Sequence, residues 1–246
     1  MNDHRFLPAR VLLVLPLVFS TLLAGCGAND PPPAGGAMAR SAAEVTMVVV
    51  DEEEYAATLQ QMYIAYFGRP AEPAGLEYWN RQLRQMLAPS SPDALAARYR
   101  SDARVRAVFD AFAGSQESQQ LYPGTTAQFV DGVYRNLFNR APDLAGLAYW
   151  TNAIDAGILT RSEAALAIML GAQNDDALCV RNKLAVATTF YRILTERVQT
   201  ILAYTGNNSN AIARQMMSLV DAKTDLVAFE ATIRKAIEQM ELNMRG

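Results

Sequence analysis

The chain contains one pattern twice: YIAYFGRPAEPAGLEYW at residues 63–79 and YRNLFNRAPDLAGLAYW at residues 134–150. The copies lie 71 positions apart, and Tyr, Phe, Arg, Ala, Gly, Leu, Tyr and Trp recur in register. An internal repeat marks a structural unit that a chain uses more than once. The pattern therefore predicts two equivalent units at the centre of the fold.

Each copy predicts a helix, a tight corner and a second helix. Apolar residues recur at helical spacing before each corner, as Leu59, Met62 and Tyr66 do in the first copy. We expect these helices to end at Gly68 and at Asn139, because glycine and asparagine best tolerate the left-handed conformation at a helix C-terminus. A proline shortly afterwards prevents each helix from continuing.

The two corners carry charged candidate site residues. Arg69 and Arg140 each follow a helix end, where backbone carbonyls favour a cation. Glu72 and Asp143 each open the second helix, and aspartate is the better N-cap of the two. We expect each arginine to form an ion pair with the acidic residue of its own corner. Binding of a ligand by these charges is the alternative.

The second helix of each copy carries a Tyr-Trp pair. Trp79 and Trp150 lie on the apolar face, and we expect both indoles in the core. Tyr78 and Tyr149 point about 100° away from that face. A glycine three positions before each tyrosine costs about 1 kcal/mol relative to alanine, so its repetition predicts close approach of another helix or of a tyrosine ring. We expect the two tyrosines to pack between helices; exposed, they could stack on a sugar ring.

The remaining sequence also favours helices, and it shows no persuasive alternation typical of strands. In chain order it predicts a mostly helical stretch over 94–113, a capped helix over 164–170, a long helix from Asp175 or Asp176 to Tyr204, a turn at 206–210, and two amphipathic helices at about 210–220 and 224–242. We predict an all-α bundle of eight or nine helices. It comprises a repeat-containing domain over 44–204 and a C-terminal helical pair over 205–246 that packs on it.

The N-terminus has the organisation of an export signal. Two arginines precede an apolar stretch over residues 11–24 that is too short to span a bilayer comfortably. The following Leu-Ala-Gly-Cys at residues 23–26 resembles the lipobox of bacterial lipoproteins. This resemblance implies removal of residues 1–25 and acylation of Cys26. Because Gly27 rather than aspartate follows, it also implies the outer membrane of a Gram-negative bacterium.

Residues 26–43, rich in Pro, Gly and Ala, are predicted to form a tether between lipid and domain. The apolar, β-branched run at 45–50 is either a strand or an extended segment docked on the domain. The acidic run at 51–54 is expected to be the solvated start of the first repeat helix, rather than a set of reactive carboxylates.

The repeat resembles the domain of unknown function family 4214, whose pattern combines Tyr, Gly-Arg, Pro-Asp, Gly-Leu and Tyr-Trp. The second copy fits this pattern better, through Tyr134, Arg140, Pro142, Asp143, Gly146, Leu147, Tyr149 and Trp150. The first copy departs at Ala71-Glu72, where the family has Pro-Asp. The similarity covers roughly residues 55–204. It implies a helical module of bacterial surface or secreted proteins, and the family offers no catalytic residues to transfer.

Composition excludes several function classes. The only histidine, His4, lies in the predicted signal, so the processed chain lacks histidine for nucleophilic catalysis or metal binding. If Cys26 is acylated, Cys179 has no disulfide partner, and its apolar surroundings favour packing. A net charge of −3 leaves no basic footprint for nucleic acid. Asp175 and Asp176 could offer oxygens to calcium, but they lack EF-hand spacing, and we expect them to cap a helix. No other cofactor is expected.

These observations favour a lipid-anchored, non-catalytic binding or scaffolding module of the cell envelope, which recognises an envelope glycan or a surface or secreted protein. The alternative is a carboxylate-based hydrolase or lyase acting on envelope polysaccharide, which requires two carboxyl groups that converge across a cleft. A third reading is a structural lipoprotein that assembles with itself.

Overall fold

The computed structural model describes residues 55–245, and all regular secondary structure within them is helical. The all-α prediction is therefore confirmed for this part of the chain. The first helix covers residues 55–67, and the others are α2 (Pro73–Gln85), α3 (Pro92–Arg98), α4 (Ala103–Ala113), α5 (Gln116–Leu121), α6 (Thr126–Phe138), α7 (Leu144–Asp155), α8 (Arg161–Leu170), α9 (Asn174–Leu194), α10 (Val198–Ala203), α11 (Gly206–Met217) and α12 (Leu226–Arg245). The described residues thus form twelve helices. The prediction of eight or nine was too low because short helices such as α5 and α10 were missed.

The predicted signal peptide, Cys26, the tether at 26–43 and the runs at 45–50 and 51–54 lie outside the described residues. Among the helices over residues 55–245, none is both long enough and apolar enough to cross a bilayer.

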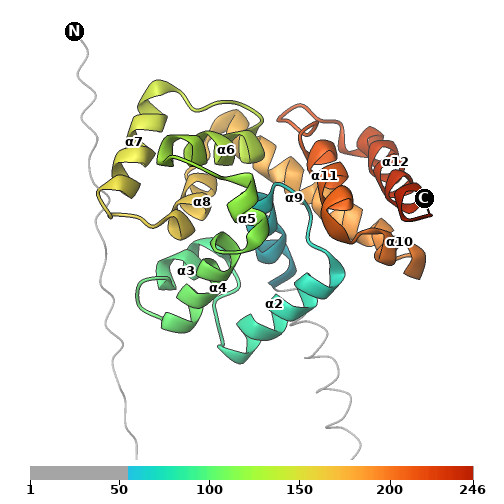
Figure 1. Cartoon of the computed structure of the whole chain (residues 1–246), viewed down its shortest axis with the longest axis horizontal. Coiled ribbons are helices and arrows are strands. Elements are labelled where there is room, and N and C mark those ends of the chain that lie inside the picture. The colour runs from blue at the N-terminus through green and yellow to red at the C-terminus, as the bar shows by residue number, and fades with distance from the viewer. Residues whose placement is uncertain (1–54, 246) are drawn as a thin grey trace, which may run out of the picture. The chain divides into compact units, whose positions relative to one another are not determined.

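The helix over residues 55–67 forms the centre of the core, and Figure 1 shows it in blue between the other helices. Its large apolar side chains are almost completely buried, including Leu59 and Met62. Phe112 of α4 packs against it, with its ring centroid 5.3 Å from that of Tyr63 and 5.4 Å from that of Phe67. This position follows from the sequence, because the helix is apolar around most of its circumference.

Both repeat copies form the predicted helix, corner and helix. Gly68 (φ +64°) follows the first helix and Asn139 (φ +56°) follows α6, both in the left-handed region. The predicted helix ends are therefore confirmed. Asp143 accepts a hydrogen bond from the backbone N–H of Gly146 and caps α7, whereas Glu72 precedes α2 without a capping hydrogen bond from its side chain.

The repeated glycine makes room for the tyrosine that begins each copy. A Cβ added at Gly75 would lie 2.0 Å from the hydroxyl oxygen of Tyr63, and one added at Gly146 would lie 3.1 Å from that of Tyr134. The sequence predicted that the glycine allows close approach of either another helix or a tyrosine, and the close approach of a tyrosine is confirmed. The first helix of each copy thus approaches the second through a tyrosine hydroxyl.

The tryptophans differ from the prediction. Trp79 and Trp150 are only half-buried and pack against the edge of the core. The reason is that α2 and α7 lie at the periphery, as Figure 1 shows. The indole N–H of Trp150 donates to the hydroxyl of Tyr134 at 3.1 Å, a polar contact that an interior of pure hydrocarbon would not provide.

Three predictions for the C-terminal third are wrong. The long helix ends at Leu194, where the hydroxyl of Thr200 donates to the terminal carbonyl at 2.6 Å, and α10 then begins a new helix. The expected turn at 206–210 is the first turn of α11, because the buried Ser209 hydroxyl donates to the carbonyl of Ala203 at 2.7 Å. The N-cap position of α9 is Gln173, so Asp175 and Asp176 lie in the first turn rather than at the cap.

The second corner also holds the loop between α11 and α12. The side-chain amide of Asn139 donates to the carbonyls of Ser218 (2.8 Å) and Val220 (2.7 Å). The amide of Asn182 on α9 donates to the carbonyl of Asp221 at 2.8 Å. These contacts fasten the C-terminal helices to the second repeat, and α12 in turn packs on α9, α10 and α11.

Candidate functional site

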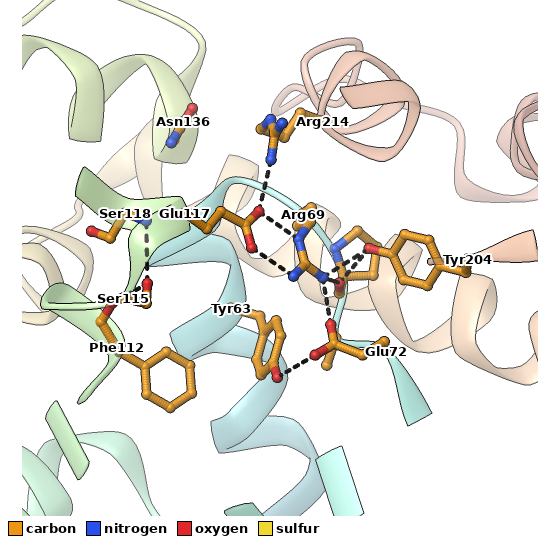
Figure 2. A network of polar contacts seen from close by, with 12 residues as sticks. Tyr63, Arg69, Glu72, Phe112, Ser115, Glu117, Ser118, Asn136, Tyr204 and Arg214 are labelled. Atoms are coloured by element: carbon orange, nitrogen blue, oxygen red, sulfur yellow. Dashed lines mark hydrogen bonds and ion pairs between the residues drawn. The ribbon is translucent and has the colours of Figure 1, made fainter. Parts of the chain in front are cut away.

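The first corner is built around a buried arginine. Arg69 is 4% exposed, and its guanidinium donates to both carboxylate oxygens of Glu117, from Nε at 2.7 Å and from Nη2 at 2.8 Å. Its Nη1 lies 2.6 Å from Oε2 of Glu72, so the ion pair predicted across this corner is confirmed. Figure 2 shows both carboxylates directed at the one guanidinium.

Further hydrogen bonds connect this cluster to other helices. Arg214 of α11 donates from Nη1 to Oε1 of Glu117 at 2.7 Å, and the hydroxyl of Tyr63 donates to Oε1 of Glu72 at 3.0 Å. The hydroxyl of Tyr204, next to α10, donates to the carbonyl of Pro70 at 2.7 Å and lies 3.2 Å from Nη1 of Arg69. The cluster therefore joins the first repeat to α5, α10 and α11.

The electrostatics of the first corner favour a charged, closed cluster. Burial lowers the pKa of Arg69, but its hydrogen bonds to Glu117 and the nearby negative charge of Glu72 outweigh burial and raise the pKa above the ordinary arginine value. Burial raises the pKa of the Tyr63 and Tyr204 hydroxyls, so both stay neutral. Nε, Nη1 and Nη2 of Arg69 therefore all have hydrogen-bond partners within the protein.

Sequence reasoning missed three members of this cluster: Glu117, Tyr204 and Arg214. Glu117 lies in the short helix α5, which Ser115 caps, and a serine before a short polar run is the only local signal for that helix. Nothing local connects Tyr204 or Arg214 to a corner more than a hundred residues earlier in the chain.

The arginine of the second corner is more accessible to solvent than the arginine of the first. The Arg140 side chain is 44% exposed and pairs with both carboxylate oxygens of Asp176, at 2.9 Å from Nε and 2.5 Å from Nη2. The predicted pair between Arg140 and Asp143 is therefore wrong. Its physical reason is that Asp143 turns back to cap α7 at Gly146, which leaves the arginine to the first turn of α9.

The ion pair with Arg140 also involves one of the two residues considered as calcium ligands, Asp175 and Asp176. Asp176 gives both oxygens to Arg140, and Asp175 is exposed beside it. Within residues 55–245, no group of three or more acidic, histidine or cysteine side chains is arranged to hold a metal ion.

Tyr78 and Tyr149 are exposed, so the expected packing between helices is wrong for both. Tyr78 is 51% exposed and Tyr149 is 65% exposed. Each ring lies edge-on against the neighbouring tryptophan, with a centroid separation of 4.9 Å in both copies. Both tyrosines therefore remain available to a partner, and they lie on helices at the periphery.

The solvent-facing sides of α2 and α7 differ in charge. On α2, the exposed residues Glu77 and Arg81 form an ion pair at 2.6 Å. The residues 71 positions later are Ala148 and Asn152. No charged residue occurs between Asp143 and Asp155, although most of α7 is accessible to solvent.

We call this surface the α7 outer face. Its exposed residues are Leu144, Ala145, Ala148, Tyr149, Asn152 and, at the C-terminal end of the helix, the charged Asp155. Leu144 is 88% exposed, and Ala153 is the buried residue of α7. An exposed apolar surface of this kind is typical of an interaction site.

Carboxylates also gather at one surface crevice, between the end of α9, α10 and α12. The crevice has a volume of about 400 Å³, and its charged lining consists of Glu196, Arg197, Arg234, Glu238 and Glu241. Arg197 lies 3.2 Å from Oε2 of Glu241, and Arg234 lies 3.9 Å from Oε2 of Glu196. Alternating charges of this kind resemble an ion-pair network more than a catalytic pair of carboxyl groups.

Comparison with known families identifies one segment. Residues 109–177 match the model of a family described as "Domain of unknown function (DUF4214)". The matched segment contains the whole second copy of the repeat and begins after the first copy ends. Neither the curated proteins nor the solved structures include a match to this chain.

Proposed function

We propose that this protein is a non-catalytic binding or scaffolding module of the cell envelope, which recognises an envelope glycan or a surface or secreted protein. The observation that carries the proposal is the α7 outer face. It combines an almost fully exposed leucine, Leu144, with an exposed tyrosine, Tyr149, on a helix whose only charged residue is Asp155 at its C-terminal end. Leaving such apolar area in water costs about 25 cal/mol per Å², so its presence favours a partner that covers it.

The proposed location follows from the N-terminus. Removal of residues 1–25 and acylation of Cys26 would attach the protein to the outer membrane of a Gram-negative bacterium, with 26–43 as the tether. Intact mass spectrometry of the protein extracted from membranes tests this location. We expect a mass that corresponds to a chain beginning at an acylated Cys26. A chain that still begins at an unmodified Met1 would overturn the proposed anchor.

Binding can be tested with a variant that the repeat itself suggests. Ala148→Glu/Asn152→Arg places on α7 the ion pair that Glu77 and Arg81 form on α2. The full-length protein, immobilised in mild detergent, is presented to glycan arrays and to solubilised envelope proteins. We expect the variant to weaken capture at least about tenfold, which corresponds to ~1.4 kcal/mol.

The matched control is Glu77→Ala/Arg81→Asn, which makes the reverse exchange on α2. We expect this control to capture the same ligands as the wild-type protein. If the α7 variant binds as well as the wild type, or if no glycan or protein is captured at all, the proposed recognition is wrong.

The second candidate function is a carboxylate-based hydrolase or lyase of envelope polysaccharide. The observation behind it is that three glutamates line the crevice beside α12, although arginines alternate with them. Glu238→Gln and Glu241→Gln test this candidate. Slow release of reducing ends from purified envelope polysaccharide, abolished by either change, would support catalysis. Equal rates for the wild type and both variants would exclude the crevice as an active site.

A further inference from the structure

We infer that the crevice between the end of α9, α10 and α12 binds a primary ammonium group carried on an alkyl chain. The inference goes beyond the proposed function and uses no residue of the α7 outer face. It follows from a buried carboxylate oxygen without a donor, from the charges that line the crevice, and from the isoleucines beside them.

Glu241 of α12 is the buried carboxylate of the crevice. It is 8% exposed, and Arg197 donates from Nη2 to its Oε2 at 3.2 Å. This contact is longer than those that Arg69 makes to Glu117, at 2.7 and 2.8 Å. Within residues 55–245, Oε1 of Glu241 accepts no hydrogen bond. A buried polar atom without a partner is costly, and more so when it carries charge, so this carboxylate favours an added donor.

The carboxylate of Glu241 can turn towards a ligand. Its Oε1 is enclosed in this structure, whereas Oε2 is held only by the long contact to Arg197. The last torsion of a glutamate side chain is broad and roughly twofold, so the group rotates easily. A donor that enters the crevice can therefore draw the carboxylate round, and both of its oxygens then have partners.

The crevice lining carries more carboxylates than guanidinium groups, because it contains Glu196, Glu238 and Glu241 but only Arg197 and Arg234. Arg234 lies 2.7 Å from Glu230, which is outside the lining, and 3.9 Å from Glu196. In the part of the chain that the structure describes, the exposed Glu238 takes part in no ion pair. Lys235 is exposed and does not line the crevice. The lining is therefore short of positive charge, which a cationic ligand supplies.

The crevice suits an organic cation better than a metal ion. No group of three or more acidic, histidine or cysteine side chains within residues 55–245 is arranged to hold a metal. The volume of about 400 Å³ is that of a small-molecule site, and Ile193 and Ile237 contribute apolar lining. An ammonium group offers three N–H donors to the carboxylates, and its alkyl chain can cover the isoleucines.

The inference is tested by ligand-observed NMR titration of the full-length protein in mild detergent. Two probes represent the two sources of such a group: 1,5-diaminopentane for a free amine, and Nα-acetyl-lysine N-methylamide for a lysine side chain of a protein. Their uncharged analogues are 1,5-pentanediol and the Nε-acetylated lysine. We expect at least one charged probe to bind at least about tenfold more tightly than its analogue. The inference is wrong if neither does.

The variant Glu238→Gln places the binding at the crevice. Glu238 is exposed and has no ion pair to lose, so we expect the variant to fold normally and to bind the charged probe at least about threefold more weakly. Glu241→Gln should weaken binding further, with circular dichroism as the check on its fold.

The matched control is Asp131→Asn on α6, which removes an exposed carboxylate paired with Arg135 at 2.7 Å and changes the net charge by the same amount. We expect this control to bind the probe as the wild type does. Unchanged affinity in Glu238→Gln, or an equal loss in Asp131→Asn, contradicts the inference.

A last comparison separates this site from the α7 outer face. Ala148→Glu/Asn152→Arg should bind the charged probe as tightly as the wild type, because no residue of α7 lines the crevice. Weaker binding in this variant would place the ammonium site elsewhere and overturn the inference.

Discussion

The ammonium nitrogen of Lys183 lies 2.7 Å from Oδ1 of Asn139, the residue that ends α6 in a left-handed conformation. Lys183 also donates to the carbonyl of Asn136 and is 1% exposed. The buried lysine thus supplies a positive charge to the carbonyl end of α6, where the helix dipole favours it. Because Asn139 holds the loop after α11, this contact links the second repeat to the C-terminal helices.

The first prediction concerns the pH dependence of stability. Burial lowers the pKa of Lys183 to about 8, whereas the unfolded chain should titrate near about 10.4. Between these values the unfolded state binds more protons, so the free energy of unfolding should rise as pH increases from 8 towards 10. Urea titrations at several pH values should show this rise in the wild type and a smaller rise in Lys183→Met.

Other buried groups oppose the rise at higher pH. Burial raises the pKa of the Cys179 thiol, so from about pH 9 this thiol ionises first in the unfolded chain and partly offsets the rise in both proteins. The buried tyrosines end the window near about pH 10. Burial raises the pKa of Tyr63 and Tyr204, so above about pH 10 these hydroxyls ionise first in the unfolded chain and stability should fall again. An identical pH slope in the wild type and Lys183→Met would show that the lysine does not titrate in this range.

The second prediction compares the two corner ion pairs. Glu117→Gln removes the carboxylate from the buried Arg69 and from Arg214, and we expect it to lower the free energy of unfolding by about 3 kcal/mol. Asp176→Asn removes the partner of the half-exposed Arg140 and should cost less than about 1 kcal/mol. Chemical denaturation of both variants checks the order. Equal losses would mean that burial of Arg69 does not decide the strength of its contacts.

The third prediction concerns the repeated glycine. Gly75→Ala introduces a Cβ 2.0 Å from the hydroxyl of Tyr63, and overpacking of this kind costs about 1–3 kcal/mol. Gly146→Ala meets Tyr134 at 3.1 Å, so the gain in helix propensity, about 1 kcal/mol, should largely offset the crowding. Thermal unfolding of the two variants should therefore rank Gly75→Ala as the less stable.

Removal of the hydroxyl provides the control for this prediction. In the double variant Gly75→Ala/Tyr63→Phe, the nearer of two crowding oxygens is absent, and Oε1 of Glu72 remains 2.4 Å from the added Cβ. We therefore expect the two changes together to cost less than the sum of the single changes. Additive losses would show that the hydroxyl of Tyr63 is not what excludes a side chain at position 75.

The fourth prediction separates the two roles of Asn139. Asn139→Gly keeps the left-handed conformation but loses the contacts to Ser218, Val220 and Lys183, whereas Asn139→Ala loses the contacts and adds strain. We expect Asn139→Ala to be the less stable of the two by about 1 kcal/mol. Equal stabilities, measured by urea denaturation, would contradict the role of backbone strain.

Several features of the fold could be predicted from the local sequence pattern alone. Gly68 and Asn139 end helices and Asp143 caps one, as the sequence predicted. The helix predicted to be capped near 164–170 is α8, which Thr160 and Glu163 cap. These features depend on a few neighbouring residues and on the backbone preferences of single residue types, so they can be recognised without knowledge of the rest of the chain. The exposure of Tyr78 and Tyr149 was misjudged, because burial depends on which helices reach the periphery.

Local residue patterns were sufficient to predict that the described residues are helical, where the repeat units turn, and that Arg69 pairs with Glu72 three residues later. Contacts between distant segments bury Arg69 against Glu117 and Tyr204, whereas Arg140 stays half-exposed beside Asp176. Two similar local patterns thus receive different neighbours from distant segments of the chain. Those neighbours closed the first corner and left the outer side of α7 uncovered.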